Sequence, residues 1–235
     1  MRILIAVYAT SSNNNGRNQH NNSSYSNRID AVLKTWAQDV KDPHRLVIAG
    51  DVGLYKKYPD KEVWVTASGA FDTYSRLPHK TLSTFRIALT HKDWDFIVKV
   101  DDDTFVHFDR LKNFLETIDP FSDFYCGHPI LHGLVYACGG AGYIMSRHCL
   151  LHIWNKLEDI TLSDTSTQED KTVGLAATET NIYLYQLPDY FTQHGHHRNS
   201  DENAITSIMG DAITTHPVTP HTFKTLYNLI KLRKL

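Results

Sequence analysis

Short apolar runs and longer amphipathic segments follow one another along the first half of the chain. The runs have the length and β-branched content of buried strands, whereas the longer segments carry apolar side chains at helical spacing. The predicted strands lie within residues 1–10, 44–51, 61–67 and 94–100, and the predicted helices within residues 28–40, 77–92 and 110–118. This alternation indicates βαβ units and therefore an α/β fold.

The second half of the chain has short strands around glycines, followed by longer helical segments. Strands are predicted within residues 123–127 and 136–147, and helices within residues 148–157, 165–177 and 219–232. No internal repeat and no linker rich in Pro, Gly or Ser divides the sequence. We therefore expect a single domain over residues 1–235.

A polar stretch, residues 11–27, follows the first predicted strand and contains almost no aliphatic side chains. Such a composition is typical of a long loop. In open α/β sheets, loops at the carboxyl ends of strands border the ligand crevice. The stretch is therefore either part of a ligand site or a surface insertion without a role.

The overall composition is that of a globular domain with nearly balanced charge. Of the 235 residues, 41% are hydrophobic and 21% are charged, and the formal net charge is −2. This balance argues against a nucleic-acid partner bound through a global positive field. The apolar run at the N-terminus is too short for a membrane span and lacks a small-residue cleavage site. We expect a buried strand there and no membrane-spanning segment.

The chain contains three cysteines, Cys126, Cys138 and Cys149, whose spacing is not that of a metal site. An odd and sparse set predicts a reducing compartment, and one disulfide with one free thiol is the alternative. The first interpretation favours a cytoplasmic location. The oligomeric state is left open by the sequence.

Three consecutive aspartates, Asp101, Asp102 and Asp103, follow the apolar run of residues 94–100. At strand spacing, Asp101 and Asp103 point to one face and Asp102 to the other. Two carboxylates on one side suit a hard divalent cation such as Mg²⁺ or Mn²⁺, which prefers oxygen ligands and offsets their repulsion. A solvated turn that caps the next helix is the alternative, but such a turn needs only one aspartate. The triplet is therefore predicted to bind a metal or a diphosphate.

Three further segments carry candidate chemistry. The glycines of CGGAGYIMSR, residues 138–147, allow close backbone approach to a ligand, or else tight packing at a strand bend. Glu169 and Asp170 lie together in a polar stretch, where one carboxylate could accept a proton from an attacking hydroxyl. The alternative is that the two acidic residues only stabilise the start of a helix, because acidic residues favour the first turn. Histidines gather in residues 193–198 and 215–221, and a neutral imidazole could complete a site made of carboxylates.

Several of these segments occur in an order that resembles a known enzyme family. They are LKTWA at 33–37, LPHKTLSTF at 77–85, WDFIVKVDDDTFV at 94–106, GGAGYIMSR at 139–147, EDKTVG at 169–174 and AITTHPVTPHTFKTLYNLIKLRK at 212–234. In content and order the chain resembles the inverting β-1,3-glycosyltransferases of family 31, the group containing Fringe and the core 1 galactosyltransferase. The resemblance covers the chain from about residue 28 to the C-terminus.

The resemblance implies a fold, a reaction and a set of ligands. The fold would be GT-A, with a Rossmann-like mixed central sheet flanked by helices. A nucleotide-binding half, about residues 1–106, would join an acceptor-binding half, about residues 107–235. The reaction would move a hexose or N-acetylhexosamine from a UDP-sugar to a hydroxyl of a glycan or glycoconjugate, with a β-1,3 linkage and Mn²⁺ (or Mg²⁺) as cofactor.

The resemblance also implies roles for individual residues. Asp103, Asp101 and His216 would hold the metal, and Asp170 would be the catalytic base, with Glu169 as its competitor. The residues that would contact the nucleotide sugar are Asp101, Asp102, Asp51, Lys80, Thr10 and Arg28. Those that would line the donor-sugar and acceptor side are Gly139, Gly140, Ala141, Tyr143 and His194.

The sequence departs from the animal members of this family in two respects. Those members carry an N-terminal membrane anchor and lumenal disulfides, whereas this chain begins within a few residues of its first strand. Lys171 stands where an aliphatic residue is expected after the acidic pair. We therefore expect a bacterial or viral relative rather than a trimmed Golgi lumenal domain. The alternative functions are nucleotidyl transfer, for which no basic triphosphate loop is found, and sugar or nucleotide binding without turnover.

Overall fold

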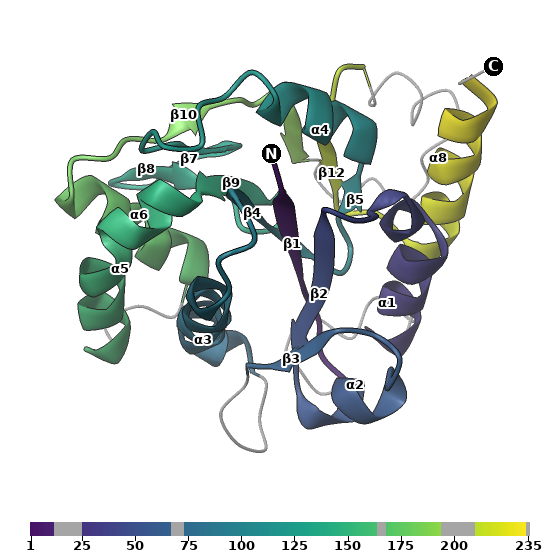
Figure 1. Ribbon diagram of the computed structural model, residues 1–235, viewed down its shortest axis with the longest axis horizontal. Helices are drawn as coiled ribbons and strands as arrows, with labels where there is room; N and C mark the ends of the chain where they lie inside the picture. The colour runs from purple at the N-terminus through teal and green to yellow at the C-terminus, as the bar shows by residue number, and fades with distance from the viewer. Residues whose placement is uncertain (12–24, 67–72, 164–167, 194–209, 234–235) are drawn as a thin grey trace.

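The computed structural model describes residues 1–11, 25–66, 73–163, 168–193 and 210–233. Its centre is a seven-stranded sheet in the order β10-β6-β9-β4-β1-β2-β3, with helices on both faces (Figure 1). The strands of this sheet are β1 (Ile3–Tyr8), β2 (Arg45–Gly50), β3 (Val63–Val65), β4 (Phe96–Asp101), β6 (Tyr125–Gly127), β9 (Tyr143–Ser146) and β10 (Tyr185–Gln186). The strands predicted in the first half of the chain are confirmed.

The sheet is mixed, and its two kinds of pairing separate along the chain. β1 lies between β2 and β4 and is parallel to both, and β2 pairs with β3 in parallel. β9 runs antiparallel to β4 and to β6, and β10 is parallel to β6. The strands β1 to β4 of the first half therefore pair with one another only in parallel within the sheet, as the βαβ alternation predicts, whereas the second half adds two antiparallel pairs and one parallel pair.

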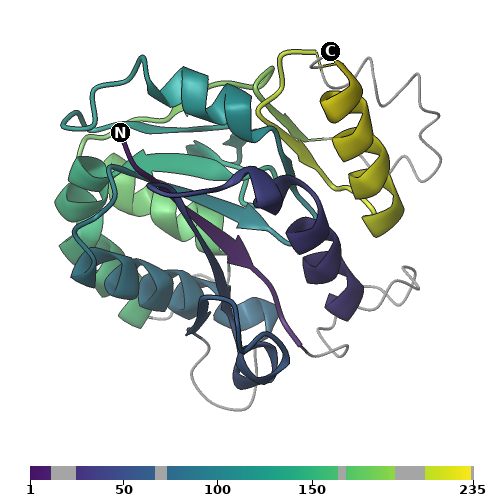
Figure 2. The same cartoon turned by 45° about the vertical axis from the view of Figure 1, so that its right-hand side comes forward.

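Helices cover the two faces of the sheet in two layers (Figures 1 and 2). The helices are α1 (Tyr25–Lys34), α2 (Val52–Lys57), α3 (Leu77–Thr90), α4 (Phe108–Leu115), α5 (Arg147–Leu162), α6 (Glu169–Glu179) and α8 (Pro220–Arg233), with 3-10 helices η1 (Trp36–Asp39) and η2 (Tyr74–Arg76). One hydrophobic core joins the sheet to α1, α4 and α8, and the other joins it to α3, α5 and α6. Successive side chains of β1 enter alternate cores, because strand side chains point to opposite faces.

The helix predicted over residues 28–40 is divided in the structure. α1 ends at Lys34, and the chain continues into η1. The hydroxyl of Thr35 donates to the carbonyl oxygen of Ala31 at 2.6 Å, and such a back-bond competes with helical backbone pairing and bends the chain. Most of the predicted loop of residues 11–27 lies outside the described residues.

A small second sheet brings the C-terminal part of the chain to the end of β4. It consists of β11 (Phe191–Gln193), β12 (Thr214–His216) and β5 (Phe105–Val106), and β12 pairs with both of the other strands. β5 follows the aspartate triplet by one residue, so β12 lies beside the triplet. A separate hairpin is formed by β7 (Pro129–Leu131) and β8 (Val135–Ala137).

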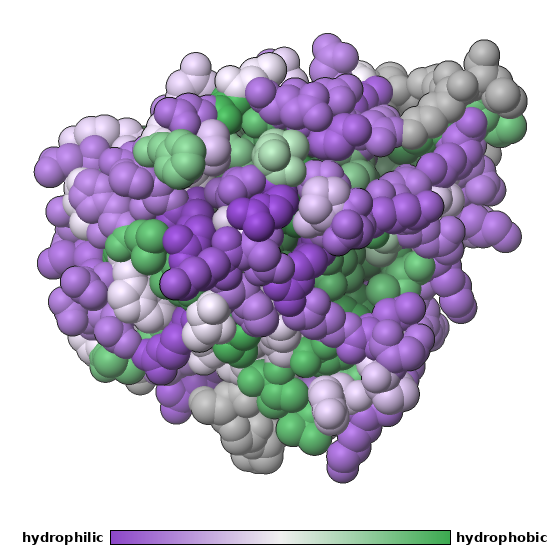
Figure 3. Space-filling model, in the orientation of Figure 1, coloured by the Kyte–Doolittle hydropathy of each residue, from purple (hydrophilic) through white to green (hydrophobic). Residues whose placement is uncertain are grey.

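Two further features of the described residues concern the cysteines and the length of the helices. Cys126, Cys138 and Cys149 are all free and buried. Within the described ranges, no helix has both the length and the apolar character that a membrane crossing requires. The face seen in Figure 3 is mostly hydrophilic, with smaller hydrophobic patches between.

Candidate active site

Asp101, Asp103 and His216 come together in one cluster. Each offers a ligand atom, and these atoms lie within 4.8 Å of one another. β4 places Asp101 at its last position, and β12 places the histidine from more than a hundred residues further along the chain. We refer to these three residues as the Asp–Asp–His cluster.

The aspartate triplet is not a continuation of the strand, contrary to the sequence interpretation. β4 ends at Asp101, and a turn follows in which the backbone N–H of Thr104 donates to the carbonyl oxygen of Asp101 at 3.1 Å. The Asp101 N–H donates to the Thr104 hydroxyl at 3.2 Å. The turn still brings Asp103 to the same side as Asp101, because it folds the chain back toward β12. The predicted convergence is therefore confirmed, but a turn produces it.

His216 is oriented by a neighbour that the sequence did not single out. Its Nδ1 lies 2.8 Å from Oε1 of Gln193, which is its register partner across β11 and β12. An amide oxygen only accepts, so Nδ1 carries the proton. Nε2 faces Oδ1 of Asp103, 3.1 Å away. Two acceptors at this distance need a proton or a cation between them.

Arg28 of α1 supplies a positive charge on the other side of the triplet. Its Nη1 donates to Oδ2 of Asp103 at 2.9 Å and to Oδ1 of Asp102 at 3.4 Å. Burial raises the pKa of Asp103, but His216 and Arg28 outweigh it, and the pKa is lowered overall. Burial and the charge of Asp103 raise the pKa of Asp102, although Arg28 opposes the rise. Oδ2 of Asp102 is buried without a hydrogen-bond partner among the described residues.

Glu169 and Asp170, the acidic pair, begin α6 but lie in different surroundings. Glu169 is only 4% exposed, and both of its oxygens are taken: Lys99 Nζ lies 2.7 Å from Oε1, and the Tyr143 hydroxyl donates to Oε2 at 3.0 Å. Burial raises the pKa of Glu169 to about 7, with Lys99 acting against the rise. Asp170 is half-buried. One of its oxygens accepts from the backbone N–H of Gly139 at 2.9 Å, and the other accepts from the backbone N–H of Lys171 at 2.8 Å.

The glycines of residues 139–142, which we call the glycine loop, lie between the acidic pair and the Asp–Asp–His cluster. A Cβ at Gly139 would lie 2.3 Å from Oε1 of Glu169, and a Cβ at Gly140 would lie 2.4 Å from Cε1 of His216. Gly142 has a φ of +86°, which disfavours any other residue. Gly139 and Gly140 therefore place no side chain between the two acidic sites.

Three carbonyl groups of the glycine loop accept hydrogen bonds from side chains in different parts of the chain. Lys99 donates to the carbonyl oxygen of Gly139 at 3.0 Å, and the Thr104 hydroxyl donates to that of Gly140 at 2.7 Å. The Thr214 hydroxyl donates to the carbonyl oxygen of Ala141 at 2.7 Å. These contacts tie the loop to β4, to the turn after it and to β12.

Three residues predicted to contact the nucleotide lie together at the carboxyl end of β1. Asp51 caps α2 by accepting from the N–H of Leu54 at 3.0 Å, and it also accepts from the Thr10 hydroxyl at 3.2 Å. Lys80 is buried, and its ammonium donates to the carbonyl oxygen of Ala9 at 2.6 Å. A nucleotide role for these residues stays a prediction.

Among the other predicted residues, Tyr143 and the glycine loop lie at the acidic sites, whereas His194 is outside the described residues. Sequence reasoning missed Lys99 and Gln193. A signal for Lys99 existed, because a lysine inside the apolar run IVKV is unusual and stands two positions before Asp101. Gln193 carried no such signal, since its importance depends on strand pairing.

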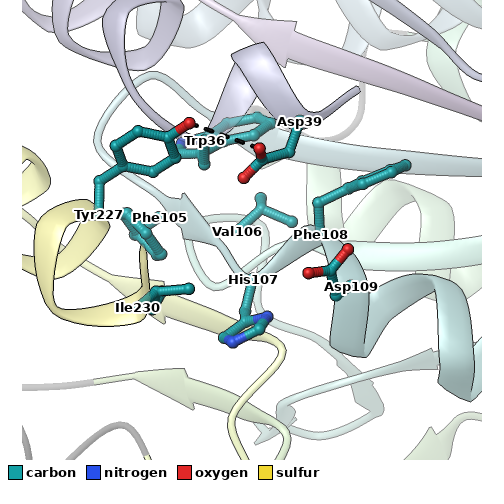
Figure 4. Close-up of a pocket in the computed structure, with 9 residues that line it drawn as sticks. All are labelled: Trp36, Asp39, Phe105, Val106, His107, Phe108, Asp109, Tyr227 and Ile230. Carbon is teal, nitrogen blue, oxygen red and sulfur yellow. Dashed lines mark hydrogen bonds between the residues drawn. The ribbon is translucent and has the colours of Figure 1, made fainter. Parts of the chain in front are cut away.

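A small pocket of the structure lies apart from these residues (Figure 4). It is lined by Trp36, Asp39, Phe105, Val106, His107, Phe108, Asp109, Tyr227 and Ile230. The Tyr227 hydroxyl points at the Asp39 carboxylate and donates to it at 3.4 Å, and Lys231 lies 2.5 Å from the same oxygen. These contacts attach α8 to η1, and we assign the pocket a structural role.

The fold is of the GT-A type that nucleotide-sugar glycosyltransferases have. Two solved structures with this overall fold are a glycosyltransferase involved in the glycosylation of the major capsid of PBCV-1 and the WbbM bifunctional glycosyltransferase. The first has a TM-score of 0.50 and 11% identity, covering 97% of this chain and 98% of that one. The second has a TM-score of 0.51 and 10% identity, covering 99% of this chain and 51% of that one.

The family is more specific than the fold. Residues 20–234 match the Fringe-like family, and the chain belongs to it. Over 123 residues the chain is also 29% identical to the glycoprotein-N-acetylgalactosamine 3-beta-galactosyltransferase 1 of Xenopus laevis. That match covers 49% of this chain, and the chain spans about a third (33%) of the relative's length.

Proposed function

We propose that this protein is a metal-dependent inverting glycosyltransferase that uses a UDP-sugar donor. It would move a hexose or N-acetylhexosamine to a hydroxyl of a glycan or glycoconjugate, in a β-1,3 linkage. One observation carries the proposal. The Asp–Asp–His cluster and the half-buried Asp170 lie on either side of the glycine loop, where Gly139 and Gly140 place no side chain between them. A donor and an acceptor could therefore meet there.

The Asp–Asp–His cluster fits Mn²⁺ (or Mg²⁺). Two carboxylates and one imidazole are an oxygen-rich donor set of the kind that these ions take. The 3.1 Å approach of the His216 Nε2 to Asp103 Oδ1 is relieved when both bind one cation. Asp101, Asp103 and His216 would hold the cation, whose positive charge would offset the negative charge on the departing UDP. The unpartnered Oδ2 of Asp102 would accept a hydrogen bond from a ligand hydroxyl, for example from the ribose.

Asp170 is the better candidate for the base. Its carboxylate is half-buried and held by two backbone N–H groups, which orient it and leave lone pairs for an acceptor hydroxyl. It would take the proton of the acceptor hydroxyl as that oxygen attacks the anomeric carbon from the side opposite to UDP. A single displacement of this kind inverts the anomeric centre. Glu169 is a poorer candidate, because Lys99 and Tyr143 already occupy its oxygens.

Calorimetric titration with UDP tests the metal-bridge part of the proposal. Wild-type protein should bind UDP in the presence of Mn²⁺ and lose the binding in EDTA, and Asp103→Ala should abolish it. Asp60→Ala is the matched control, because that side chain is 77% exposed, and it should bind as the wild type does. Tight binding in EDTA that Asp103→Ala leaves unchanged would contradict the proposal.

A screen of UDP-sugars for hydrolysis in the presence of Mn²⁺ would identify the donor. Release of UDP from one sugar nucleotide supports transfer chemistry, whereas turnover of nucleoside triphosphates alone would favour nucleotidyl transfer. Binding without any turnover would favour a non-catalytic relative. The cytoplasmic location stays a prediction, and the three free, buried thiols are the observation that supports it.

A further inference from the structure

Lys99 is a charged side chain in the middle of the protein. It belongs to β4, is 2% exposed, and stands between Val98 and Val100, which enter the other hydrophobic core. Its ring neighbours are Tyr8 and Tyr143, whose centroids lie 4.8 and 5.9 Å from Nζ. Burying an ammonium group is unfavourable unless the group is paired and hydrogen-bonded. The contacts of Lys99 must therefore offset the free energy lost when its ammonium leaves water.

The contacts of Lys99 match the capacity of an ammonium group. Nζ lies 2.8 Å from Oδ1 of Asp101, 2.7 Å from Oε1 of Glu169 and 3.0 Å from the carbonyl oxygen of Gly139. An ammonium has three N–H donors, and here each has one acceptor. These three contacts satisfy the ammonium group in its buried position.

The three acceptors belong to three different parts of the candidate active site. Asp101 is a member of the Asp–Asp–His cluster, and with Oδ1 held by Lys99, Oδ2 is the oxygen left for a cation. Glu169 precedes Asp170 on the first turn of α6. Gly139 accepts from Lys99 through its carbonyl and donates through its N–H to Asp170. One ammonium thus connects the metal side of the site with the base side.

Strand geometry explains why this residue can reach all three. Lys99 and Asp101 are two positions apart on β4, so both side chains point to the same face. Across the antiparallel pair, Lys99 is the register partner of Tyr143, whose hydroxyl donates to the second oxygen of Glu169. The lysine and the tyrosine therefore hold the two oxygens of the glutamate from adjacent strands.

We propose that Lys99 is a positioning residue. It holds the metal-binding carboxylate of Asp101 and the base Asp170 in a defined orientation relative to each other. This inference rests on the proposed function. Without Lys99, the Asp101 side chain would be free to turn away from the cation. Gly139 would also lose the contact that orients it, and its N–H is the group that donates to Asp170. Both the affinity for Mn²⁺ with UDP and the rate of transfer should then fall, although Lys99 touches neither ligand.

The test needs variants that separate positioning from folding. Lys99→Met alone leaves Glu169 buried without its cation and is expected to lower the melting temperature. Lys99→Met with Glu169→Gln removes both charges, so this double variant should fold. Glu169→Gln alone keeps Lys99 on Asp101 and Gly139, and Lys99→Arg keeps the positive charge.

The readouts are the melting temperature, the calorimetric affinity for UDP with Mn²⁺, and kcat and KM for sugar transfer. In the folded double variant, the affinity should fall about 10- to 100-fold, as when other outer-shell partners of metal ligands are removed. kcat should fall as well. Glu169→Gln should keep the affinity near that of the wild type, and Lys99→Arg should recover part of what the double variant loses.

A folded double variant with wild-type affinity and kcat would overturn the inference and leave Lys99 a purely structural residue. An affinity loss in Glu169→Gln equal to that of the double variant would also overturn it, because the effect would then follow the glutamate. Failure of the proposed function is a different outcome, since wild-type protein would itself show no Mn²⁺-dependent binding of UDP and no transfer.

Discussion

The aspartate triplet and the acidic pair are both groups of adjacent carboxylates, yet the protein surrounds them differently. The triplet faces Arg28 and an imidazole, and the arrangement leaves oxygens and one nitrogen converging on a common point. In the acidic pair, one carboxylate is buried and fully hydrogen-bonded, and its neighbour is held by backbone N–H groups. Adjacent acids therefore do not share a role by being adjacent. Their partners decide the role.

The electrostatic consequences differ in the same way. The pKa of Asp103 is lowered because His216 and Arg28 outweigh its burial, which keeps this carboxylate ionised. The pKa of Glu169 is raised to about 7 by burial, despite its ion pair with Lys99. The surroundings of the two carboxylates thus shift their pKa values in opposite directions.

The sharpest test of this contrast is Asp170→Asn beside Asp103→Ala. Asp170→Asn should lower kcat by about 10²- to 10⁴-fold, because it removes a general base, while leaving the Mn²⁺-dependent affinity for UDP unchanged. Asp103→Ala should lose the binding itself. Transfer assays and calorimetry on the same preparations distinguish the two. Near-normal turnover of Asp170→Asn would move the base to Glu169.

Two neighbouring glycines offer a matched pair of smaller perturbations. Gly140→Ala pushes on the His216 ring, so it should weaken Mn²⁺-dependent UDP binding by about 10- to 100-fold. Gly139→Ala pushes on Glu169 and the base beside it, so it should lower kcat at saturating donor by up to about 100-fold. Titrations and saturation kinetics give both quantities. Loss of the same quantity in both variants would show that the loop does not separate the two acidic sites.

Gln193 should have a more moderate effect, confined to the metal side. Gln193→Leu removes the acceptor that orients the His216 ring, so the affinity for Mn²⁺ with UDP should fall about 10-fold. Gln193→Glu retains an acceptor oxygen and should keep most of the affinity. Calorimetry at fixed UDP measures both. Equal affinity in Gln193→Leu and the wild type would show that Gln193 does not support the binding of Mn²⁺ with UDP.

The smallest effect is expected at Lys171. This residue follows Asp170, the proposed base, and occupies a position where an aliphatic residue is expected. Its contact with Asp170 is made by the backbone N–H, which any residue except proline supplies. Surface substitutions that break no specific contact change free energies by about 0.5 kcal/mol or less. Lys171→Val should therefore change kcat by less than about twofold. The same transfer assay checks this. A large loss would mean that the ammonium takes part in binding or catalysis.

The sequence predicted the strands of the first half, the helices around them and the acidic residues of both sites. These features are local, because periodicity and composition over a few residues carry them. The predicted single helix over residues 28–40 was wrong in one detail, where Thr35 interrupts it. The family was also recognisable, because its segments keep their order along the chain, and residues 20–234 match it.

Only the tertiary structure decided how each acidic residue is surrounded. The partners that distinguish Glu169 from Asp170 come from β4, β9 and the glycine loop, and the partner that orients His216 comes from a strand pairing. Such contacts join residues far apart in sequence, so no local pattern encodes them. The sequence by itself determined where the carboxylates stand. Packing, burial and the charge of Lys99 determined how each one is held.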